Sequence, residues 1–300
     1  MSMTVTPLGD GFAAEITGLD IAKPVDDATR DAVVAAMDTS ATVVIRGEPV
    51  PQEAQIAFAR AFGDLDGQNG VLTTGIKRRV REELTDISNL DEKSAMLARD
   101  DRRRLFNLGN RLWHTDSSFK RVAARYSMLH AHTVAPEGGE TQVCDLRAAY
   151  DALDDASKAK LEGMIAIHSI FTSRALLGFE DFSEDERRAL PPIRRPIVRV
   201  HPGSGRKTLF LASHAGSIIG MPTAEARILI RELVEHATQP EFVYTHRWRK
   251  GDLLIWDNRC TMHRARPFDE DRYQRDMRRA TVMETEAAEV DAEAAARQVA

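Results

Sequence analysis

The stretch FVYTHRWRKGDLLIWDNRCTMH, residues 242–263, decides how this chain is expected to fold. Two of its runs, 242–248 and 252–257, are rich in β-branched, aromatic and aliphatic residues, which is typical of strands. Arg249-Lys250-Gly251 between them predicts a hairpin. After the second strand, a turn is expected to return His263 to the interior of a barrel.

Short strand-like runs with turn signals continue on both sides of this stretch, and helical spacing interrupts them. Such a pattern favours a jelly roll over a βαβ sheet. The predicted fold is mainly β with helices: a double-stranded β-helix (jelly-roll) barrel decorated by N-terminal and inserted helices. Strands are expected at 13–20, 42–46, 85–89, 113–119, 124–133, 140–145, 197–200, 208–212 and 279–283, and helices at 26–37, 53–62, 145–167 and 223–237.

One domain is expected over residues 1–283, followed by a frayed Ala/Glu-rich tail at 284–300. Periodicity weakens over residues 66–104, where glycines and two basic clusters occur. A segment of this length without regular structure is consistent with an active-site lid or with a solvated surface loop. The sequence leaves both interpretations open.

Composition excludes several classes of protein. The 300 residues are 43% hydrophobic and 29% charged, which is unlike disordered or collagenous chains. With 41 basic and 46 acidic residues, the net charge of −5 argues against a nucleic-acid partner. No apolar stretch approaches the roughly 18 residues of a membrane span. Cys144 and Cys260 are read as reduced thiols, and we expect a cytoplasmic homo-oligomer.

His114 and Asp116, in the run WHTDSSF at 113–119, are the first candidates for chemistry. On an extended strand, residues two apart point to the same face, so both could bind one metal ion. Taken alone, the pair is better explained by a His–Asp hydrogen bond at the end of a strand, so a third ligand is needed. His263 supplies a possible third ligand, and two His with one carboxylate form the facial triad of non-haem Fe(II) oxygenases, which leaves three positions open.

Two arginines after His263 could complete such a site. A 2-oxo acid that chelates the metal through its carboxylate and keto oxygen needs a cation for its distal carboxylate, and Arg suits this role. Arg275 and Arg279 are four residues apart, so on a strand they share one face. The alternative is a basic surface, because other arginines crowd this stretch: Arg264, Arg266, Arg272 and Arg278.

The ordered motifs WHTDSSF, PEGGET, GDLLIWDNRCTMHRA and RRAT resemble the taurine dioxygenase family of Fe(II)/2-oxoglutarate-dependent oxygenases, and most of all its 2,4-dichlorophenoxyacetate dioxygenase branch. The resemblance implies that His114, Asp116 and His263 hold Fe(II). It also implies that Thr141, in GGET, and Arg275 bind the co-substrate 2-oxoglutarate.

The same resemblance implies that the prime substrate is bound by Arg279, which would pair with its acidic group, and by His214 and Asn110. One position departs from the family pattern. Val71 stands where the phenoxyacetate enzyme has a substrate-binding lysine, so the contacts made by that loop differ.

The implied function is hydroxylation of a small carboxylate, preferably an aryloxyalkanoate, with O2 and 2-oxoglutarate consumed and succinate and CO2 released. Ether cleavage would give a phenol and glyoxylate or another 2-oxo acid. One alternative is a taurine or alkylsulfonate dioxygenase of the same family. Further alternatives are a non-oxidative metal-dependent hydrolase or isomerase and a non-enzymatic barrel that binds a metal or an acid.

Overall fold

The structure is a computed structural model that describes residues 3–9, 11–67 and 77–284. Val71 and residues 285–300 of the expected tail lie outside the described residues. Glu284, the first residue of that expected tail, is anchored: its carboxylate lies 3.2 Å from the Arg199 guanidinium, and its backbone N–H donates to Ala123. No helix in the described ranges is both long and apolar enough to cross a membrane.

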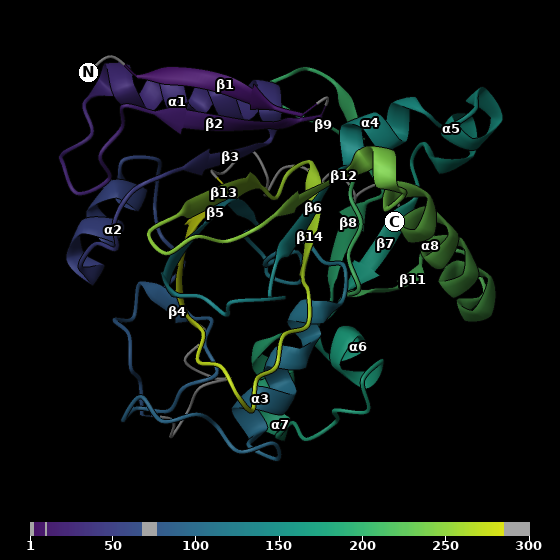
Figure 1. The fold of residues 1–300 in the computed structure, drawn as a ribbon. Coiled ribbons are helices and arrows are strands. Elements are labelled where there is room, and N and C mark those ends of the chain that lie inside the picture. Colours follow the sequence, from purple (N-terminus) through teal and green to yellow (C-terminus); the bar gives the residue numbers. More distant parts are fainter. Residues whose placement is uncertain (1–2, 10, 68–76, 285–300) are drawn as a thin grey trace.

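Two β-sheets build the core of the fold (Figure 1). The larger one has the strand order β1-β2-β3-β13-β5-β15-β4, and the smaller one has the order β12-β6-β14. Two minor sheets, β11-β7-β8 and β10-β9, extend the smaller side. The strands are β1 (Thr4–Leu8), β2 (Ala13–Thr17), β3 (Thr42–Ile45), β4 (Leu84–Asp86), β5 (Ala124–Thr133), β6 (Thr141–Asp145), β7 (Ile165–His168), β8 (Ile193–Pro196), β9 (Val198–Val200), β10 (Lys207–Leu209), β11 (Ala215–Ile218), β12 (Val243–His246), β13 (Leu253–Asp257), β14 (Thr261–Ala265) and β15 (Asp276–Met283).

The side chains of the two sheets alternate between three apolar layers, as the two-residue period of a strand requires. Leu254 and Trp256 of β13 pack with Val143 of β6, so this layer fills the space between the sheets. Leu253 and Ile255 point the other way, into a cluster that includes residues of α1 and α2. A third cluster joins the smaller sheet to α4 and α8. The fold is therefore the jelly roll that the sequence predicts, with sheets that do not close into one continuous barrel.

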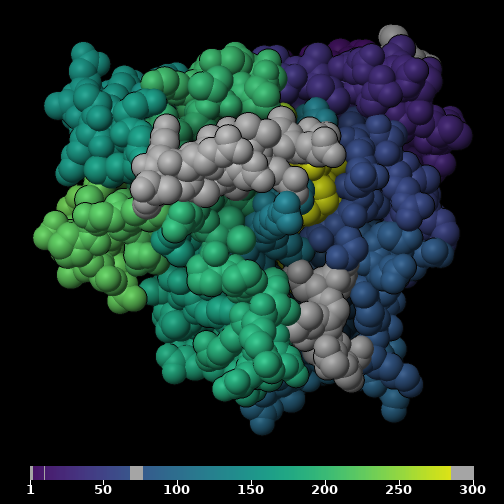
Figure 2. Space-filling view, turned by 180° about the vertical axis from the view of Figure 1, so that it is seen from behind, coloured from purple at the N-terminus to yellow at the C-terminus, as the bar shows by residue number. Residues whose placement is uncertain are grey.

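The helices cover the outer faces of the sheets. In Figure 2, seen from behind, the N-terminal layer (purple) and α8 (light green) lie on opposite flanks. The helices expected at 26–37, 53–62 and 223–237 are present with small shifts. The helices are α1 (Asp27–Ser40), α2 (Gln52–Arg60), α3 (Arg102–Asn107), α4 (Leu146–Asp151), α5 (Asp155–Leu161), α6 (Ile170–Ala175), α7 (Glu184–Ala189) and α8 (Thr223–Ala237), with short 3₁₀ turns η1 (Leu108–Arg111) and η2 (Pro240–Phe242).

The expected hairpin at 242–257 is wrong. β12 pairs with β6 in the smaller sheet, whereas β13 pairs with β3 and β5 in the larger one. Gly251 explains the crossing, because its φ is +89° and a Cβ there would lie 2.0 Å from the carbonyl oxygen of Gly47. Only glycine allows the chain to pass so close to another backbone while adopting this conformation. The turn therefore connects two sheets instead of two neighbouring strands.

The helix expected over 145–167 is also corrected. Two short helices, α4 and α5, occupy its first part, and the chain then turns into β7, which pairs with β8 and β11. Gly163 lies at this break, with a φ of +77° that favours glycine. A β-branched run, Ile165–His168, can join a sheet edge once the helix has ended.

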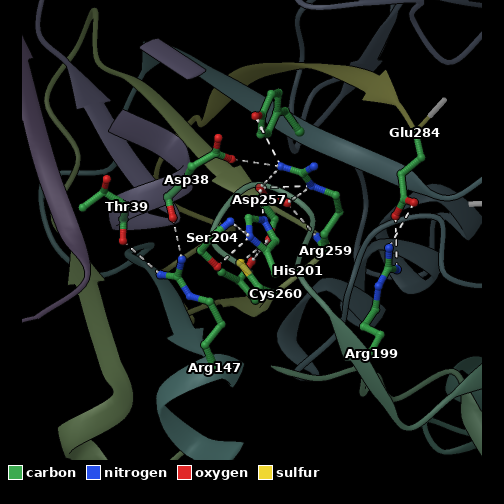
Figure 3. A network of polar contacts seen from close by, with 12 residues as sticks. Asp38, Thr39, Arg147, Arg199, His201, Ser204, Asp257, Arg259, Cys260 and Glu284 are labelled. Atoms are coloured by element: carbon green, nitrogen blue, oxygen red, sulfur yellow. Dashed lines mark hydrogen bonds and ion pairs between the residues drawn. The ribbon is translucent and has the colours of Figure 1, made fainter. Parts of the chain in front are cut away.

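A buried polar network fixes the turn between β13 and β14 (Figure 3). Asp257 is fully buried and accepts hydrogen bonds from the Arg259 guanidinium, at 2.6 Å, and from His201, at 3.0 Å. Burial opposes ionisation of the Asp257 carboxyl, but the charge of Arg259 and the His201 hydrogen bond hold its pKa well below the usual range. The turn that leads to His263 is thus built around one ion pair.

We expect Asp257→Ala to lower the free energy of unfolding by about 3–5 kcal/mol, because it removes the buried carboxylate that lies 2.6 Å from the Arg259 guanidinium. Urea unfolding measures this change. Asp38→Ala is the matched control, since its partly exposed carboxylate lies 3.5 Å from the same guanidinium. Equal losses in both variants would contradict a central role for Asp257.

Candidate active site

His114 and His263 are brought together by a backbone bridge that links the segment after η1 to β14. The N–H of His114 donates to the carbonyl of His263 at 3.0 Å, and the reverse bond measures 2.8 Å. The two imidazole rings lie 4.1 Å apart between their centroids. Sequence reasoning predicts this meeting of residues 114 and 263, and the structure confirms it.

Asp116 reaches the same point, although not from a strand as expected. Residues 113–119 form a single bridge at His114 followed by turns, because Ser117 has a φ of +53° that ends the extended backbone. The Asp116 carboxylate lies 3.8 Å from Nε2 of His114 and 3.5 Å from Nε2 of His263. Each of the three residues offers one ligand atom within 4.8 Å of the others.

These three side chains fit a divalent metal ion. Nδ1 of His114 lies 2.7 Å from the carbonyl of Leu112, so the ring proton belongs on Nδ1 and the lone pair of Nε2 faces Asp116. Burial lowers the pKa of both imidazoles, that of His263 well below its usual value, which keeps them neutral and able to bind a metal. The set of two nitrogens and one carboxylate with open positions suits Fe(II).

The carboxylate of Asp116 is oriented by two hydrogen bonds. Ser127 of β5 donates to Oδ2 at 2.6 Å, and Arg279 of β15 donates to Oδ1 at 2.6 Å. Asn258 supports both sides of this arrangement, since its side chain accepts from the Asp116 N–H and donates to Ser127. Burial disfavours the charged carboxylate, but the charge of Arg279 and the hydrogen bond from Ser127 hold the pKa of Asp116 well below its usual range.

A second His–Asp–Cys group does not offer a metal site. The possible ligand atoms of His201, Asp257 and Cys260 also lie within 4.8 Å of one another. However, both oxygens of Asp257 accept hydrogen bonds from Arg259, and the two ring nitrogens of His201 are engaged by Ser204 and Asp257. Burial raises the pKa of the Cys260 thiol well above its usual value, so the metal-binding thiolate is disfavoured.

A cavity of about 80 Å³ adjoins His263 and contains both residues that the family resemblance implies for 2-oxoglutarate. Arg275 is buried, its Nη2 has no hydrogen-bond partner, and it forms no ion pair with any carboxylate in the described part of the chain. Burial lowers the pKa of Arg275 to about 10, so it remains charged at neutral pH. Thr141 lies in the same cavity, and its hydroxyl oxygen accepts from the indole N–H of Trp248 at 3.1 Å.

A larger cavity of about 240 Å³ opens on the other side of His114. Asn110 and Arg279 line both cavities, and His214 lines only the larger one, with its ring 6.1 Å from that of His114. Residues 77–107, the described part of the predicted lid or loop, supply much of the wall. Apolar lining comes from Val80, Leu90, Leu97, Phe106, Phe119 and Ile170.

Sequence reasoning missed the side chains that support this site. Ser127 lies in no motif, and Asn258 lies in the motif GDLLIWDNRCTMHRA, which gives no sign of its contacts. Only the packing of the strands places the two side chains beside Asp116. Arg174, on α6, also lines the larger cavity. The sequence around it shows no clear strand or helix pattern, so its position in the fold could not be predicted. Its burial is the signal that identifies it, and no sequence pattern contains that information.

The jelly roll and its His–Asp–His cluster together define a family of metal-dependent dioxygenases. The chain belongs to the family described as "Taurine catabolism dioxygenase TauD, TfdA family", whose model matches residues 4–281.

Two curated relatives and one solved structure are similar over nearly their whole length. The alpha-ketoglutarate-dependent 2,4-dichlorophenoxyacetate dioxygenase of Cupriavidus pinatubonensis is 47% identical, over 95% of this chain and 99% of the relative. The (S)-phenoxypropionate/alpha-ketoglutarate-dioxygenase of Sphingobium herbicidovorans is 35% identical, over 88% and 90%. The crystal structure of AAD-2 in complex with Mn(II) and N-oxalylglycine superposes with a TM-score of 0.87, at 45% identity, and covers 94% of this chain and 98% of AAD-2.

Replacing Arg279 with Met should lower the free energy of unfolding of chelator-treated protein by about 3 kcal/mol at pH 7, because it leaves a buried carboxylate unpaired. In the parent protein, the lowered pKa of Asp116 gives stability that is present above the unfolded pKa of about 3.9 and is lost below it. In the variant, the charge of Arg279 no longer offsets burial, so the pKa of Asp116 rises and the variant gains less stability than the parent as pH rises above about 4. The stability gap should therefore widen between pH 4 and pH 7.

Arg278→Met is the control for this change. Arg278 is adjacent on β15, and its guanidinium makes a long contact of 3.8 Å with Asp276. Urea unfolding of both variants across this pH range measures the difference. A gap that stays constant with pH would contradict the pairing of Arg279 with Asp116.

Proposed function

We propose that this protein is an Fe(II)- and 2-oxoglutarate-dependent dioxygenase that hydroxylates a small carboxylate, most specifically an aryloxyalkanoate. One observation carries the proposal: a His–Asp–His cluster adjoins a narrow cavity that contains Arg275, a buried cation without an acidic partner. A site that must bind a metal and a dicarboxylate needs both parts. Relatives that are named for alpha-ketoglutarate and for 2,4-dichlorophenoxyacetate or (S)-phenoxypropionate support it.

In this proposal His114, Asp116 and His263 hold Fe(II). When bound, the metal activates O2 together with 2-oxoglutarate and supplies the oxidation, with succinate and CO2 as products. The protein contributes orientation. Ser127 and Arg279 fix the Asp116 carboxylate from both sides, and the carbonyl of Leu112 fixes the tautomer of His114.

Arg275 and Thr141 would hold 2-oxoglutarate in the smaller cavity. The unpartnered Nη2 of Arg275 is available to the distal carboxylate. Because Trp248 already donates to the Thr141 oxygen, the Thr141 hydroxyl proton remains free to be donated to a carboxylate oxygen. The Mn(II) and N-oxalylglycine of AAD-2, a metal with a diacid on the same fold, support this assignment.

The prime substrate would occupy the larger cavity, where Asn110, His214 and Arg279 lie beside the metal ligands. The apolar walls, with Phe119 and Ile170 among them, suit an aromatic ring better than a short alkylsulfonate. Hydroxylation of the carbon beside an ether oxygen gives a hemiacetal, which collapses to a phenol and a 2-oxo acid. No hydrolytic residue is needed for that cleavage.

We also infer that the protein acts on small molecules in the cytoplasm. Both cysteines are buried free thiols, which fits a reducing compartment. The net charge of −5 fits the absence of a nucleic-acid partner. A homo-oligomeric state, a single domain over 1–283 and the absence of membrane association stay predictions from the sequence.

A substrate screen tests the proposed reaction. The purified protein with Fe(II), 2-oxoglutarate and O2 should form succinate with 2,4-dichlorophenoxyacetate or one enantiomer of an aryloxypropionate, together with the phenol and the matching 2-oxo acid. Taurine should give little product. Preference for taurine would favour the sulfonate alternative, and turnover without O2 would favour a hydrolase. Saturable acid binding without succinate would indicate a binding protein.

Replacing Arg275 with Gln should raise the KM for 2-oxoglutarate about 10- to 100-fold, because a charge-assisted hydrogen bond to the distal carboxylate is lost. Metal affinity, measured by titration of the metal-free protein, should change little. Arg266→Gln is the matched control, since Arg266 lines the same cavity but is exposed. Equal KM values in the two variants would reject the role of Arg275.

A further inference from the structure

Arg174 is a second buried cation that faces the site without an acidic partner. It lies on α6, is 5% exposed and lines the larger cavity. Its Nη1 donates to the hydroxyl of Ser173 at 3.0 Å, whereas its Nε has no hydrogen-bond partner. No carboxylate in the described ranges forms an ion pair with it. Burial lowers the pKa of Arg174 to about 10, so it is still charged at neutral pH.

The other arginines of this cavity contrast with Arg174. Arg79, Arg102, Arg103 and Arg279 each form an ion pair with a protein carboxylate, and Arg78 donates to backbone carbonyls. A buried cation without a counter-ion is costly, so it is kept where a ligand supplies the opposite charge. Among the described residues, Arg174 is therefore the buried arginine of this cavity that pairs with no carboxylate and whose charge is left for a bound anion.

The surroundings of Arg174 hold its guanidinium in place without neutralising it. The ring of Phe106 lies 4.1 Å from the guanidinium carbon. Gly109 lies directly against the group, because a Cβ added at Gly109 would be 2.1 Å from Nη1. The absence of a side chain at this position makes room for the arginine. The group is thus fixed by an aromatic face, a glycine and one hydroxyl, all of them neutral.

His214, which the family resemblance places near the substrate, cannot supply the same contact. The hydroxyl of Ser173 donates its only proton to the carbonyl of Ile170 at 2.8 Å. The bond of 2.9 Å between Ser173 and Nδ1 of His214 must therefore be donated by the histidine. Its other nitrogen is left as an acceptor, and burial together with His114 and Arg174 lowers the pKa of His214 well below its usual value. A neutral acceptor does not bind a carboxylate.

We propose that Arg174 binds the carboxylate of the prime substrate. This role rests on the proposed function. Arg279 is less available for that carboxylate, because Nη1 of Arg279 already donates to Asp116. In an aryloxyacetate the carboxylate is bonded to the methylene that is oxidised. Ser173 connects Arg174 to His214, and the His214 ring packs near that of His114. Anchoring the acid at Arg174 therefore directs the methylene toward the metal ligands.

Kinetics with a charged and a neutral substrate test this proposal. Arg174→Gln should raise the KM for 2,4-dichlorophenoxyacetate about 10- to 100-fold while the KM for 2-oxoglutarate stays within about twofold. The parent protein should prefer the acid over the corresponding amide, and the variant should lose this preference. Arg174→Lys should restore part of it. Arg103→Gln, which removes an ion-paired arginine from the same cavity, should keep the preference.

A binding measurement separates recognition from turnover. Calorimetric titration of the metal-free protein with 2,4-dichlorophenoxyacetate should show weaker binding in Arg174→Gln and in Gly109→Ala, since the added methyl group displaces the guanidinium. If Arg174→Gln does not fold, Gly109→Ala and Arg174→Lys give the same comparison of acid with amide.

An unchanged acid preference, or an equal loss for acid and amide, would overturn the role of Arg174 while the dioxygenase assignment stands. A parent protein that turns over no carboxylate would overturn the proposed function itself.

Discussion

The buried carboxylate of Asp116 contacts side chains from both of the main sheets. Asp116 is 5% exposed, and its carboxylate and backbone N–H interact with residues from four different parts of the fold. Ser127 comes from β5, Arg279 from β15, Asn258 from the turn after β13, and His263 from β14 of the smaller sheet. A buried anion is tolerated only when such partners surround it. The same contacts aim the carboxylate at the two imidazoles, so the stability of the interior and the geometry of the site have one origin.

The two cavities that meet at His114 share one electrostatic feature. Each contains a buried arginine without a protein carboxylate, Arg275 in the smaller cavity and Arg174 in the larger one. The remaining arginines around the larger cavity are compensated by acidic neighbours or by backbone carbonyls. Each cavity therefore holds one buried guanidinium that pairs with no carboxylate of the described residues. Two anionic ligands of different size would pair with these two arginines, which is what a dicarboxylate co-substrate and an acidic prime substrate supply.

Local sequence signals were sufficient where a single element determines the structure. The helix expected at 223–237 has the observed bounds, and the ligand candidates His114, Asp116 and His263 converge as their spacing and chemistry suggest. The hairpin predicted at 242–257 is wrong because its two strands join different sheets. Its two strands have the right composition, but composition does not say which sheet a strand joins. That choice depends on partners more than a hundred residues away, and on a glycine that permits the crossing.

Residues whose role depends on their burial cannot be predicted from the sequence for the same reason. Arg174 belongs to a sequence with many arginines, and nothing in the sequence separates the one without a partner from those that are paired on the surface. Ser127 lies in a strand that was correctly expected, yet its contact with Asp116 follows from the packing of two sheets. Spacing along the chain predicts which residues share a face, whereas the depth of a side chain is a property of the assembled fold.

The backbone bridge between His114 and His263 has a consequence for how the protein folds. It closes a loop of 149 residues, the difference between the two positions, and such long-range contacts are slow to form because the chain loses much conformational entropy before they stabilise it. The ligand cluster cannot exist before this closure. An ion that binds all three side chains would therefore stabilise only chains that have completed this long-range step, and would slow the reopening of that loop.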